Sequence, residues 1–112
     1  MTSSRSGSGI ILALTNSVAG REAEFNKWYD EVHVRDLVAV PGINEAQRFG
    51  VVSSNDLPRS PFDYLTIYRT EITLDQVFAN MAATRGQRVI SDSLAPGGGL
   101  WAFEPMGPPV TR

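Results

Sequence analysis

The sequence predicts an α+β fold in which an antiparallel four-stranded sheet carries two helices on one face. Four short segments have strand character, and two longer segments repeat apolar residues at helical spacing. Their order along the chain is strand, helix, strand, strand, helix, strand. Short chains with this order form the split βαβ, or ferredoxin-like, arrangement. A chain of 112 residues is long enough for one such domain.

Four runs rich in β-branched and aromatic residues are predicted to be strands. The first is a continuous apolar run, which is typical of a strand covered on both faces. The later runs place apolar side chains on both of their alternating faces. The runs cover residues 10–15, 43–53, 62–70 and 100–104.

Two helices are predicted between these strands. The first covers residues 21–38 and stops before Pro41, because proline disfavours helical geometry in the residue that precedes it. The second begins at Thr73, which forms a capping box with Gln76. Gly86 is predicted to end it.

One domain is expected over residues 10–105. Residues 1–9 are small and polar and are predicted to form a disordered tail, and residues 106–112 an extended one. The apolar run at residues 10–14 is too short for a signal or membrane segment, so we expect a cytoplasmic protein.

The composition argues against several classes of partner and site. Ten basic residues stand against 12 acidic ones without a basic run, so we expect neither nucleic acid nor membrane as a partner. The absence of cysteine excludes disulfides, thiolate nucleophiles and zinc–cysteine sites. The chain has one histidine and no suitable carboxylate cluster, so no metal site is expected.

On a helical wheel of the first helix, apolar side chains fill one arc, which must be buried. Asp36 falls near the middle of this arc and His33 on its edge. A carboxylate among aromatic side chains costs several kcal/mol unless it is paired or hydrated. Asp36 therefore turns to solvent or pairs with an arginine, or else the arc lines a cavity into which Tyr29, His33 and Asp36 point. The apolar members of the arc are Phe25, Trp28, Tyr29, Val32 and Ala39.

The predicted sheet has apolar residues on both faces, but the two helices cover only one. An exposed apolar face of this size is not stable as the surface of a monomer. The same face of a second copy is its simplest cover, so we expect a homodimer formed by sheet-on-sheet contact.

The run FNKWYDEVHVRDLVAVPGINEAQRF resembles the EthD-like branch of the dimeric α+β barrel superfamily. The specific part is an aromatic residue, Tyr29, a histidine one turn later, His33, and Pro41-Gly42 before the second strand. The resemblance covers roughly residues 10–104. It implies a homodimer whose sheets form a barrel, with a cleft between helices and sheet in each subunit.

That superfamily includes cofactor-free monooxygenases, haem-degrading enzymes, muconolactone isomerases and polyketide cyclases, so the fold carries over better than any activity. Its haem-degrading members bind iron through a histidine on the second helix. The second predicted helix has no histidine here, so haem is disfavoured, and we expect no cofactor.

The leading hypothesis is a small enzyme of lyase, isomerase or cyclase type that acts by proton transfer. Its substrate would be a mostly apolar small molecule, aromatic or polyketide-like. His33 would be the general acid or base. Asp36 would hold its tautomer, and Tyr29 would donate to a developing oxyanion, with Arg48 as an electrostatic alternative.

Six residues are candidates for substrate binding, each with a structural alternative. Arg48 is a clamp, a surface residue or a partner for Asp36, and Asn16 is a turn former or a group at a pocket mouth. The four aromatic candidates line apolar walls or pack in the core. The candidates are Arg48, Trp28, Asn16, Tyr64, Trp101 and Phe103.

Two other functions remain open at this point. One is a non-catalytic ligand-binding or stress-associated dimer, and the other is a cofactor-independent monooxygenase. The segment 87–99 is either an entrance loop or a linker into the last strand.

Overall fold

The computed structural model describes residues 8–112. The predicted disordered tail lies mostly outside this range. Its last residue, Gly9, is ordered: its backbone N–H donates to Thr70 Oγ1 at 2.8 Å, and its carbonyl accepts from Thr70 N. The sheet pairing therefore begins one residue earlier than predicted.

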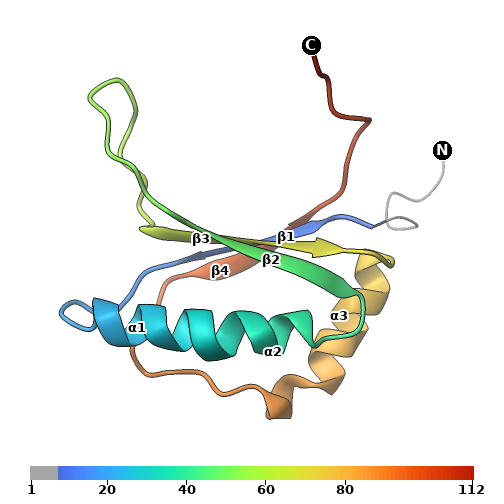
Figure 1. Ribbon diagram of the computed structural model, residues 1–112, viewed down its shortest axis with the longest axis horizontal. Coiled ribbons are helices and arrows are strands. Elements are labelled where there is room, and N and C mark those ends of the chain that lie inside the picture. The colour runs from blue at the N-terminus through green and yellow to red at the C-terminus, as the bar shows by residue number, and fades with distance from the viewer. Residues whose placement is uncertain (1–7) are drawn as a thin grey trace.

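The four strands form one antiparallel sheet in the order β2-β3-β1-β4, with the helices on one face (Figure 1). This order confirms the predicted ferredoxin-like fold. The second and third strands are shorter than predicted, and residues 51–63 between them form a long connection. The strands are β1 (Ile10–Thr15), β2 (Ile43–Gly50), β3 (Tyr64–Thr70) and β4 (Gly99–Phe103).

The first predicted helix is continuous but contains three parts, α1 (Glu22–Trp28), η2 (Tyr29–His33) and α2 (Val34–Val38). The middle part is a π-helical turn, in which the N–H of Val34 bonds to the carbonyl of Tyr29. One extra residue in a turn rotates the following side chains by roughly 100° about the helix axis.

This rotation makes the wheel prediction wrong beyond Tyr29. Leu37 and Val40 are buried in place of Val32 and Ala39, which are exposed. The sequence of the turn, YDEVH, has no glycine or proline that would have marked the irregularity.

The second predicted helix is α3 (Leu74–Ala83), followed by a 3-10 turn, η3 (Arg85–Gln87). The Thr73 cap is confirmed, since its hydroxyl accepts from the N–H of Gln76. The predicted last helical residue, Arg85 before Gly86, lies two residues beyond the observed end of α3 at Ala83. Thr84 Oγ1 donates to the carbonyl of Asn80 at 2.8 Å and closes the last turn earlier.

The turn between α2 and β2 requires glycine. Gly42 has φ of 99°, in the left-handed region, and a Cβ there would collide with the side chain of Ile72. Pro41-Gly42 thus ends the helix and lets the chain pass closely under α3.

Two clusters form the core between sheet and helices. Phe25, Trp28 and Tyr29 form an aromatic cluster under α1. An aliphatic cluster lies between α2, α3 and the sheet, and Tyr68 is its one aromatic member. Its other members are Ile11, Ala13, Leu37, Val40, Ile43, Leu74 and Val77.

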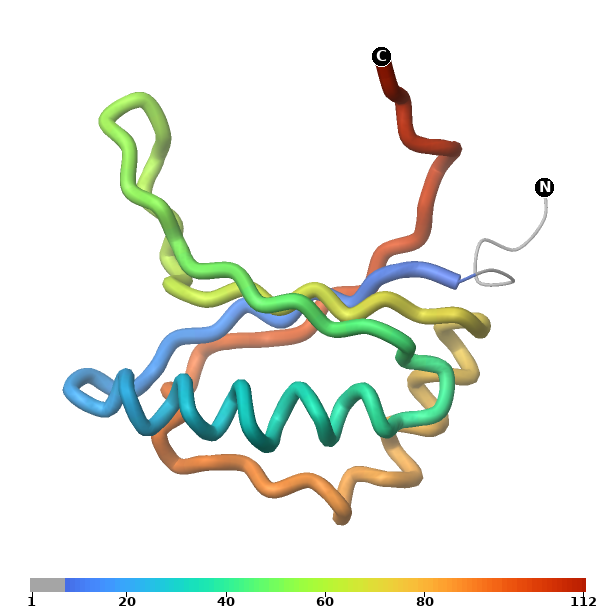
Figure 2. Tube along the Cα trace, viewed as in Figure 1, coloured from blue at the N-terminus to red at the C-terminus, as the bar shows by residue number. Residues whose placement is uncertain are grey.

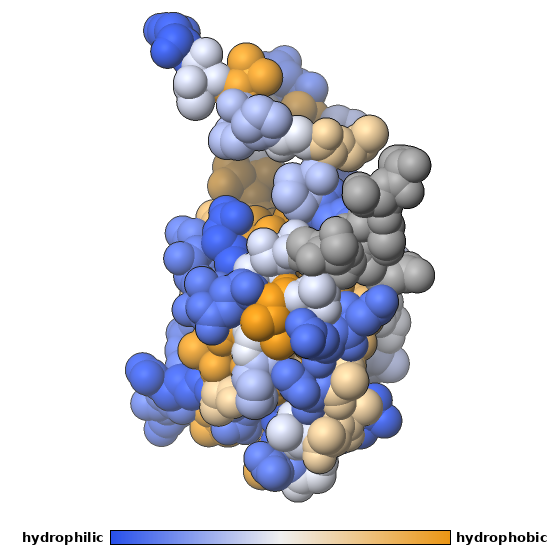
Figure 3. Space-filling view, turned by 90° about the vertical axis from the view of Figure 1, so that its right-hand side faces the viewer, coloured by the Kyte–Doolittle hydropathy of each residue, from blue (hydrophilic) through white to orange (hydrophobic). Residues whose placement is uncertain are grey.

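The opposite surface of the sheet, here called the outer face, is not covered by any helix of residues 8–112 (Figure 1). The connection 51–63 and the tail 104–112 rise on this side, and in Figure 3 the tail stands clear of a mostly hydrophilic body. Strand alternation and register place eight apolar residues on the outer face. They are Ile10, Leu12, Leu14, Phe49, Leu65, Ile67, Trp101 and Phe103.

Within residues 8–112, the helices are all too short or too polar to cross a membrane.

Candidate functional site

A cavity of about 530 Å³ lies between the helix-covered face of the sheet, the helical segment around His33, and the chain from Arg88 to Leu100. Small-molecule sites commonly have volumes of about 300–1,000 Å³. Figure 2 shows the chain after α3 running alongside α1 and α2 to reach β4. The apolar lining includes Ile11, Ala13, Leu37, Ile43, Met81 and Leu94, and the polar lining is Thr15, Tyr29, His33, Tyr68, Arg85 and Arg88.

The imidazole of His33 is half-buried at the wall of this cavity. Its ring stacks on Trp28 with centroids 4.6 Å apart and meets the Tyr29 ring edge-on at 4.8 Å. Its Nδ1 is buried without a hydrogen-bond partner among the described residues. We infer that Nε2 is the nitrogen that faces the cavity.

The position of His33 results from the π turn. A regular helix would carry His33 at the edge of the buried arc, as the wheel predicted. The extra residue in η2 turns the imidazole inward, in line with the buried Tyr29 and Leu37. π turns occur often at functional sites, and this one places the only histidine of the chain.

The pKa of His33 is lowered from 6.5 to about 4, chiefly by burial; the charge of Asp36 opposes this shift, and the positive charges of Arg88 and Arg48 add to it. The imidazole is therefore neutral at neutral pH. A neutral imidazole can accept a proton or a hydrogen bond at the nitrogen that faces the cavity.

Protonation of His33 should destabilise the folded state. Because the unfolded histidine titrates near 6.5 and the folded one near 4, the unfolded chain binds more protons between these values, and stability falls as the pH is lowered through this window. Allowing for the partial exposure of the ring, we expect a loss of about 1–2 kcal/mol between pH 7 and pH 5. Urea unfolding at each pH measures the free energy of unfolding and therefore this loss.

The His33→Gln variant is the control for that titration. His33 is the only histidine, so the variant should lose most of the pH dependence above pH 5. If the free energy of unfolding fell equally with pH in the wild type and in His33→Gln, His33 would not titrate as described.

Two further polar atoms of cavity-lining residues lack partners. Tyr68 Oη and Thr15 Oγ1 are buried, and neither has a partner at good hydrogen-bond geometry among the described residues, although the hydroxyls of Tyr29 and Thr66 lie close enough to Tyr68 to influence its pKa. Burial, and next the neighbouring Tyr29, raise the pKa of Tyr68, so its phenol stays protonated. Tyr29 itself is 2% exposed and lines the same cavity. Unpaired buried polar groups are rare in folded proteins and call for an explanation.

Asp36 is not where the wheel placed it. The π turn rotates it away from the cavity, and it lines a small neighbouring hollow instead, half-buried. Since Nδ1 of His33 has no hydrogen-bond partner, Asp36 does not hold the imidazole tautomer. Its field still raises the pKa of His33, against the larger effect of burial.

Arg48 lies behind Tyr29 and does not line the cavity. Its guanidinium pairs with Asp30 at 2.8 Å and donates to Asn26 Oδ1 at 2.8 Å, so the suggested pairing with Asp36 is wrong. The same group lies 4.4 Å from the centre of the Tyr29 ring. Arg48 thus supports the aromatic cluster by a cation–π contact.

Three other candidates have structural partners. Trp28 Nε1 donates to the carbonyl of Val89 at 2.9 Å, and Tyr64 stacks against Phe25 at 5.0 Å. Asn16 Oδ1 accepts from the N–H of Asp63 and its Nδ2 donates to the carbonyl of Pro61, so Asn16 connects the end of β1 to the connection 51–63 and neither forms a local turn nor lines the cavity. Among them only Trp28 touches the site, through its stack on His33.

Trp101 and Phe103 lie on the outer face, away from the cavity. Trp101 pairs with Leu12 and Phe103 with Ile10 across the sheet, so both side chains point away from the helices. They are 46% and 51% exposed. Their strand neighbour Leu100 lines the cavity instead.

Four polar residues line the cavity that were not predicted as site residues: Thr15, Tyr68, Arg85 and Arg88. For Tyr68 a signal existed, because it alternates with Thr66 on the buried face of a predicted strand. For Arg88 there was none, since it lies in an irregular segment whose path only the folded chain defines.

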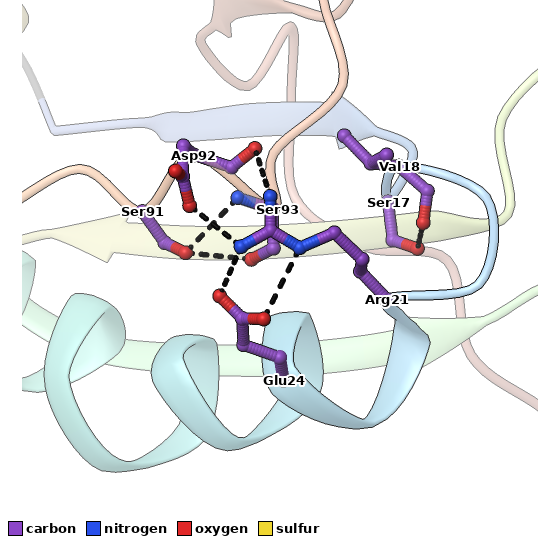
Figure 4. A network of polar contacts seen from close by, with 7 residues as sticks. All are labelled: Ser17, Val18, Arg21, Glu24, Ser91, Asp92 and Ser93. Carbon is purple, nitrogen blue, oxygen red and sulfur yellow. Dashed lines mark hydrogen bonds and ion pairs between the residues drawn. The ribbon is translucent and has the colours of Figure 1, made fainter.

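The segment after α3 is fixed to α1 rather than free. Arg21 donates to the carbonyl and the carboxylate of Asp92 and pairs with Glu24, while buried Ser93 bonds to Ser91 (Figure 4). The N–H of Val18 donates to the carbonyl of Ser93 at 2.7 Å. These bonds hold the wall of the cavity in place.

Two bacterial proteins are among the solved structures that resemble this chain. An ethyl tert-butyl ether D (EthD) family protein from Bacillus halodurans superposes with a TM-score of 0.55 at 17% identity, covering 88% of this chain and 99% of its own. The chain shares the fold of this EthD family protein. A "putative monooxygenase" from Shewanella loihica, at a TM-score of 0.56 and 13% identity, covers 91% of this chain and 98% of its own.

The EthD-like fold confirms the resemblance drawn from the segment around His33. No family model matches the chain, and no curated protein is similar to it in sequence. The part of the chain that the structure describes has no group of three or more histidine, aspartate or glutamate side chains placed to hold a metal ion.

Proposed function

We propose that the cavity binds a mostly apolar small molecule and that His33 removes a proton from it. The observation that carries this proposal is the neutral imidazole of His33, which stands among unpaired hydroxyl groups in a ligand-sized apolar cavity. Hydrogen bonds from Arg21 and Val18 attach the wall of the cavity to the start of α1, and a base held in place contributes more to catalysis than a mobile one.

The chemistry follows from these groups. Nε2 of His33 takes a proton from an acidic C–H bond next to a carbonyl, and the electron pair of that bond moves to the carbonyl oxygen. The hydroxyls of Tyr68 and Tyr29 donate to the enolate oxygen that forms. The imidazolium then returns the proton to another atom. Isomerase, lyase and cyclase reactions all use this first step.

The low basicity of His33 limits the substrates. A base with a pKa of about 4 is weak, so the C–H bond must be unusually acidic. Ketones whose enolates are aromatic or conjugated satisfy this requirement.

Anthrone, an aromatic ketone with acidic hydrogens, is a suitable probe. Under argon in D2O, the protein should accelerate exchange of its acidic hydrogens, followed by NMR. If exchange with the folded protein were no faster than in buffer alone, the result would contradict the proposal.

Oxygen provides the test for the second candidate function, cofactor-independent oxygenation. The Shewanella loihica neighbour is the observation that favours it. This reaction also begins with removal of a proton. Consumption of oxygen with anthrone in air, in addition to exchange under argon, would favour an oxygenase over the isomerase, lyase and cyclase group.

The Tyr68→Phe variant should gain stability and lose activity. Removing a buried hydroxyl without a partner should raise the free energy of unfolding by about 1 kcal/mol. Anthrone exchange should fall about tenfold, because the enolate loses a donor. Tyr64→Phe is the matched control: its hydroxyl accepts from Asn26 at 3.2 Å, so stability should drop slightly and exchange persist. A Tyr68→Phe variant with unchanged exchange would exclude the donor role.

We also propose that a second copy of the chain covers the outer face. Eight apolar residues lie there without a helix above them, and the connection 51–63 and the tail 104–112 stand at its sides (Figure 1). Two such faces packed together would close a barrel between the sheets, as the family resemblance implies.

A further inference from the structure

The charged side chains that line the cavity are all basic. Arg85 and Arg88 lie at the end of α3, and no aspartate or glutamate of residues 8–112 belongs to the lining. The chain as a whole has more acidic than basic residues, 12 against 10. The positive charge of the cavity is thus a local feature.

The guanidinium of Arg88 is held in place by uncharged groups. Nη1 donates to Thr84 Oγ1 and Nη2 to the carbonyl of Met81, both at 2.8 Å. These bonds use two of its five N–H groups and leave its charge without a counterion. Asp36 lines the neighbouring hollow with Arg88 but is not in ion-pair contact with it.

Other arginines of the fold show the contrast. Arg21, Arg48 and Arg69 each form an ion pair with a carboxylate. Arg88 is half-buried like Arg48, yet it has no acidic partner in the described part of the chain. A positioned, unpaired guanidinium beside an apolar cavity is suited to an anionic group of a ligand.

We propose that the ligand of this cavity is an apolar ring compound that carries a carboxylate or phenolate, and that Arg88 binds this anionic group directly. Arg85, which is exposed at the same end of the cavity, is a second positive charge for it. The inference rests on the proposed function for the location of the ligand and narrows its chemical class.

This arrangement orients the ligand. Its anionic end lies near the end of α3, and its ring contacts apolar lining residues such as Ile11 and Leu37. The opposite part of the ring system then meets His33 and Tyr68. Arg88 is in this scheme a specificity-determining residue, and the proton transfer belongs to other groups.

Two dyes with the same aromatic skeleton provide the test. 1-Anilinonaphthalene-8-sulfonate is anionic, and N-phenyl-1-naphthylamine is its neutral counterpart. The wild-type protein should bind the anionic dye more tightly. Arg88→Met should weaken binding of the anionic dye about tenfold or more, because a charge-assisted contact is lost. The affinity for the neutral dye should change less than twofold.

NMR of the only histidine, His33, shows whether the dyes bind in the cavity. Both dyes should shift the imidazole resonances of His33, which lines the cavity. Arg59→Met removes the same charge from the exposed connection 51–63 and should leave both affinities unchanged. Arg88→Lys keeps the charge and should retain part of the preference.

Several results would overturn the inference. Equal losses for both dyes in Arg88→Met, equal effects of Arg88→Met and Arg59→Met, or binding without movement of the His33 resonances each contradict it. The test needs no turnover. A protein that discriminates the dyes as expected but does not exchange anthrone hydrogens would refute the proton transfer and keep the anion site.

Discussion

The His33→Gln variant is expected to exchange the acidic hydrogens of anthrone about 10²–10⁴-fold more slowly than the wild type, the range that one positioned base contributes. Glutamine is polar and similar in length to histidine, but its amide does not accept a proton at neutral pH. Exchange into D2O under argon, followed by NMR, measures the effect.

The control for this variant is Asp36→Asn. Asp36 does not bond to Nδ1 of His33 and does not line the cavity, so its amide variant should keep the exchange rate within about threefold. If Asp36→Asn and His33→Gln exchanged equally slowly, the result would support the role predicted from the sequence, in which Asp36 holds the tautomer of His33. Unchanged exchange in His33→Gln would leave the cavity as a binding site only.

The Trp101→Asp variant is expected to abolish the dimer. Trp101 lies on the outer face, 46% exposed, so aspartate does little harm to the single subunit but would bury an unpaired charge between two sheets. Light scattering coupled to gel filtration should find the wild type near 24.4 kDa, twice the subunit mass of 12.2 kDa, and the variant near 12.2 kDa.

Val52→Asp is the matched control. Val52 is 82% exposed in the connection 51–63 and gains the same charge, yet it is not one of the eight residues on the outer face. It should remain dimeric. A wild-type protein of 12.2 kDa at micromolar concentration would show that the outer face is not covered by a second copy.

The fold was accessible from the sequence because its signals are local. The apolar run at β1, the Thr73 cap and the Pro41-Gly42 turn each fix one element where they stand. Element order then selects the sheet topology, since few arrangements suit a short chain.

The site was harder to predict from the sequence, because it depends on how side chains are rotated about the first helix and on which residues pair across the sheet. The wheel put Tyr29, His33 and Asp36 on one arc because it assumed regular turns; in the structure Tyr29 and His33 line the cavity, and Asp36 lines a neighbouring hollow. The orientation of Trp101 depends on its register with β1, which strand alternation alone does not fix.

Arg88 and Tyr68 show a further limit. Each becomes part of the site through polar atoms that the fold leaves unpaired or uncompensated, and this property exists only when the neighbours are known. Residue type and spacing along the sequence do not show which polar atoms will lack a partner in the folded chain.

The wide turn at Tyr29–His33 bears on how such a site is acquired or lost. A substitution alters one side chain, whereas loss of one residue between Tyr29 and His33 would turn the side chains of α2 relative to those of α1 by roughly 100° about the helix axis. A single deleted codon would therefore prevent the aromatic side chains of α1 and the aliphatic side chains of α2 from packing on the sheet together.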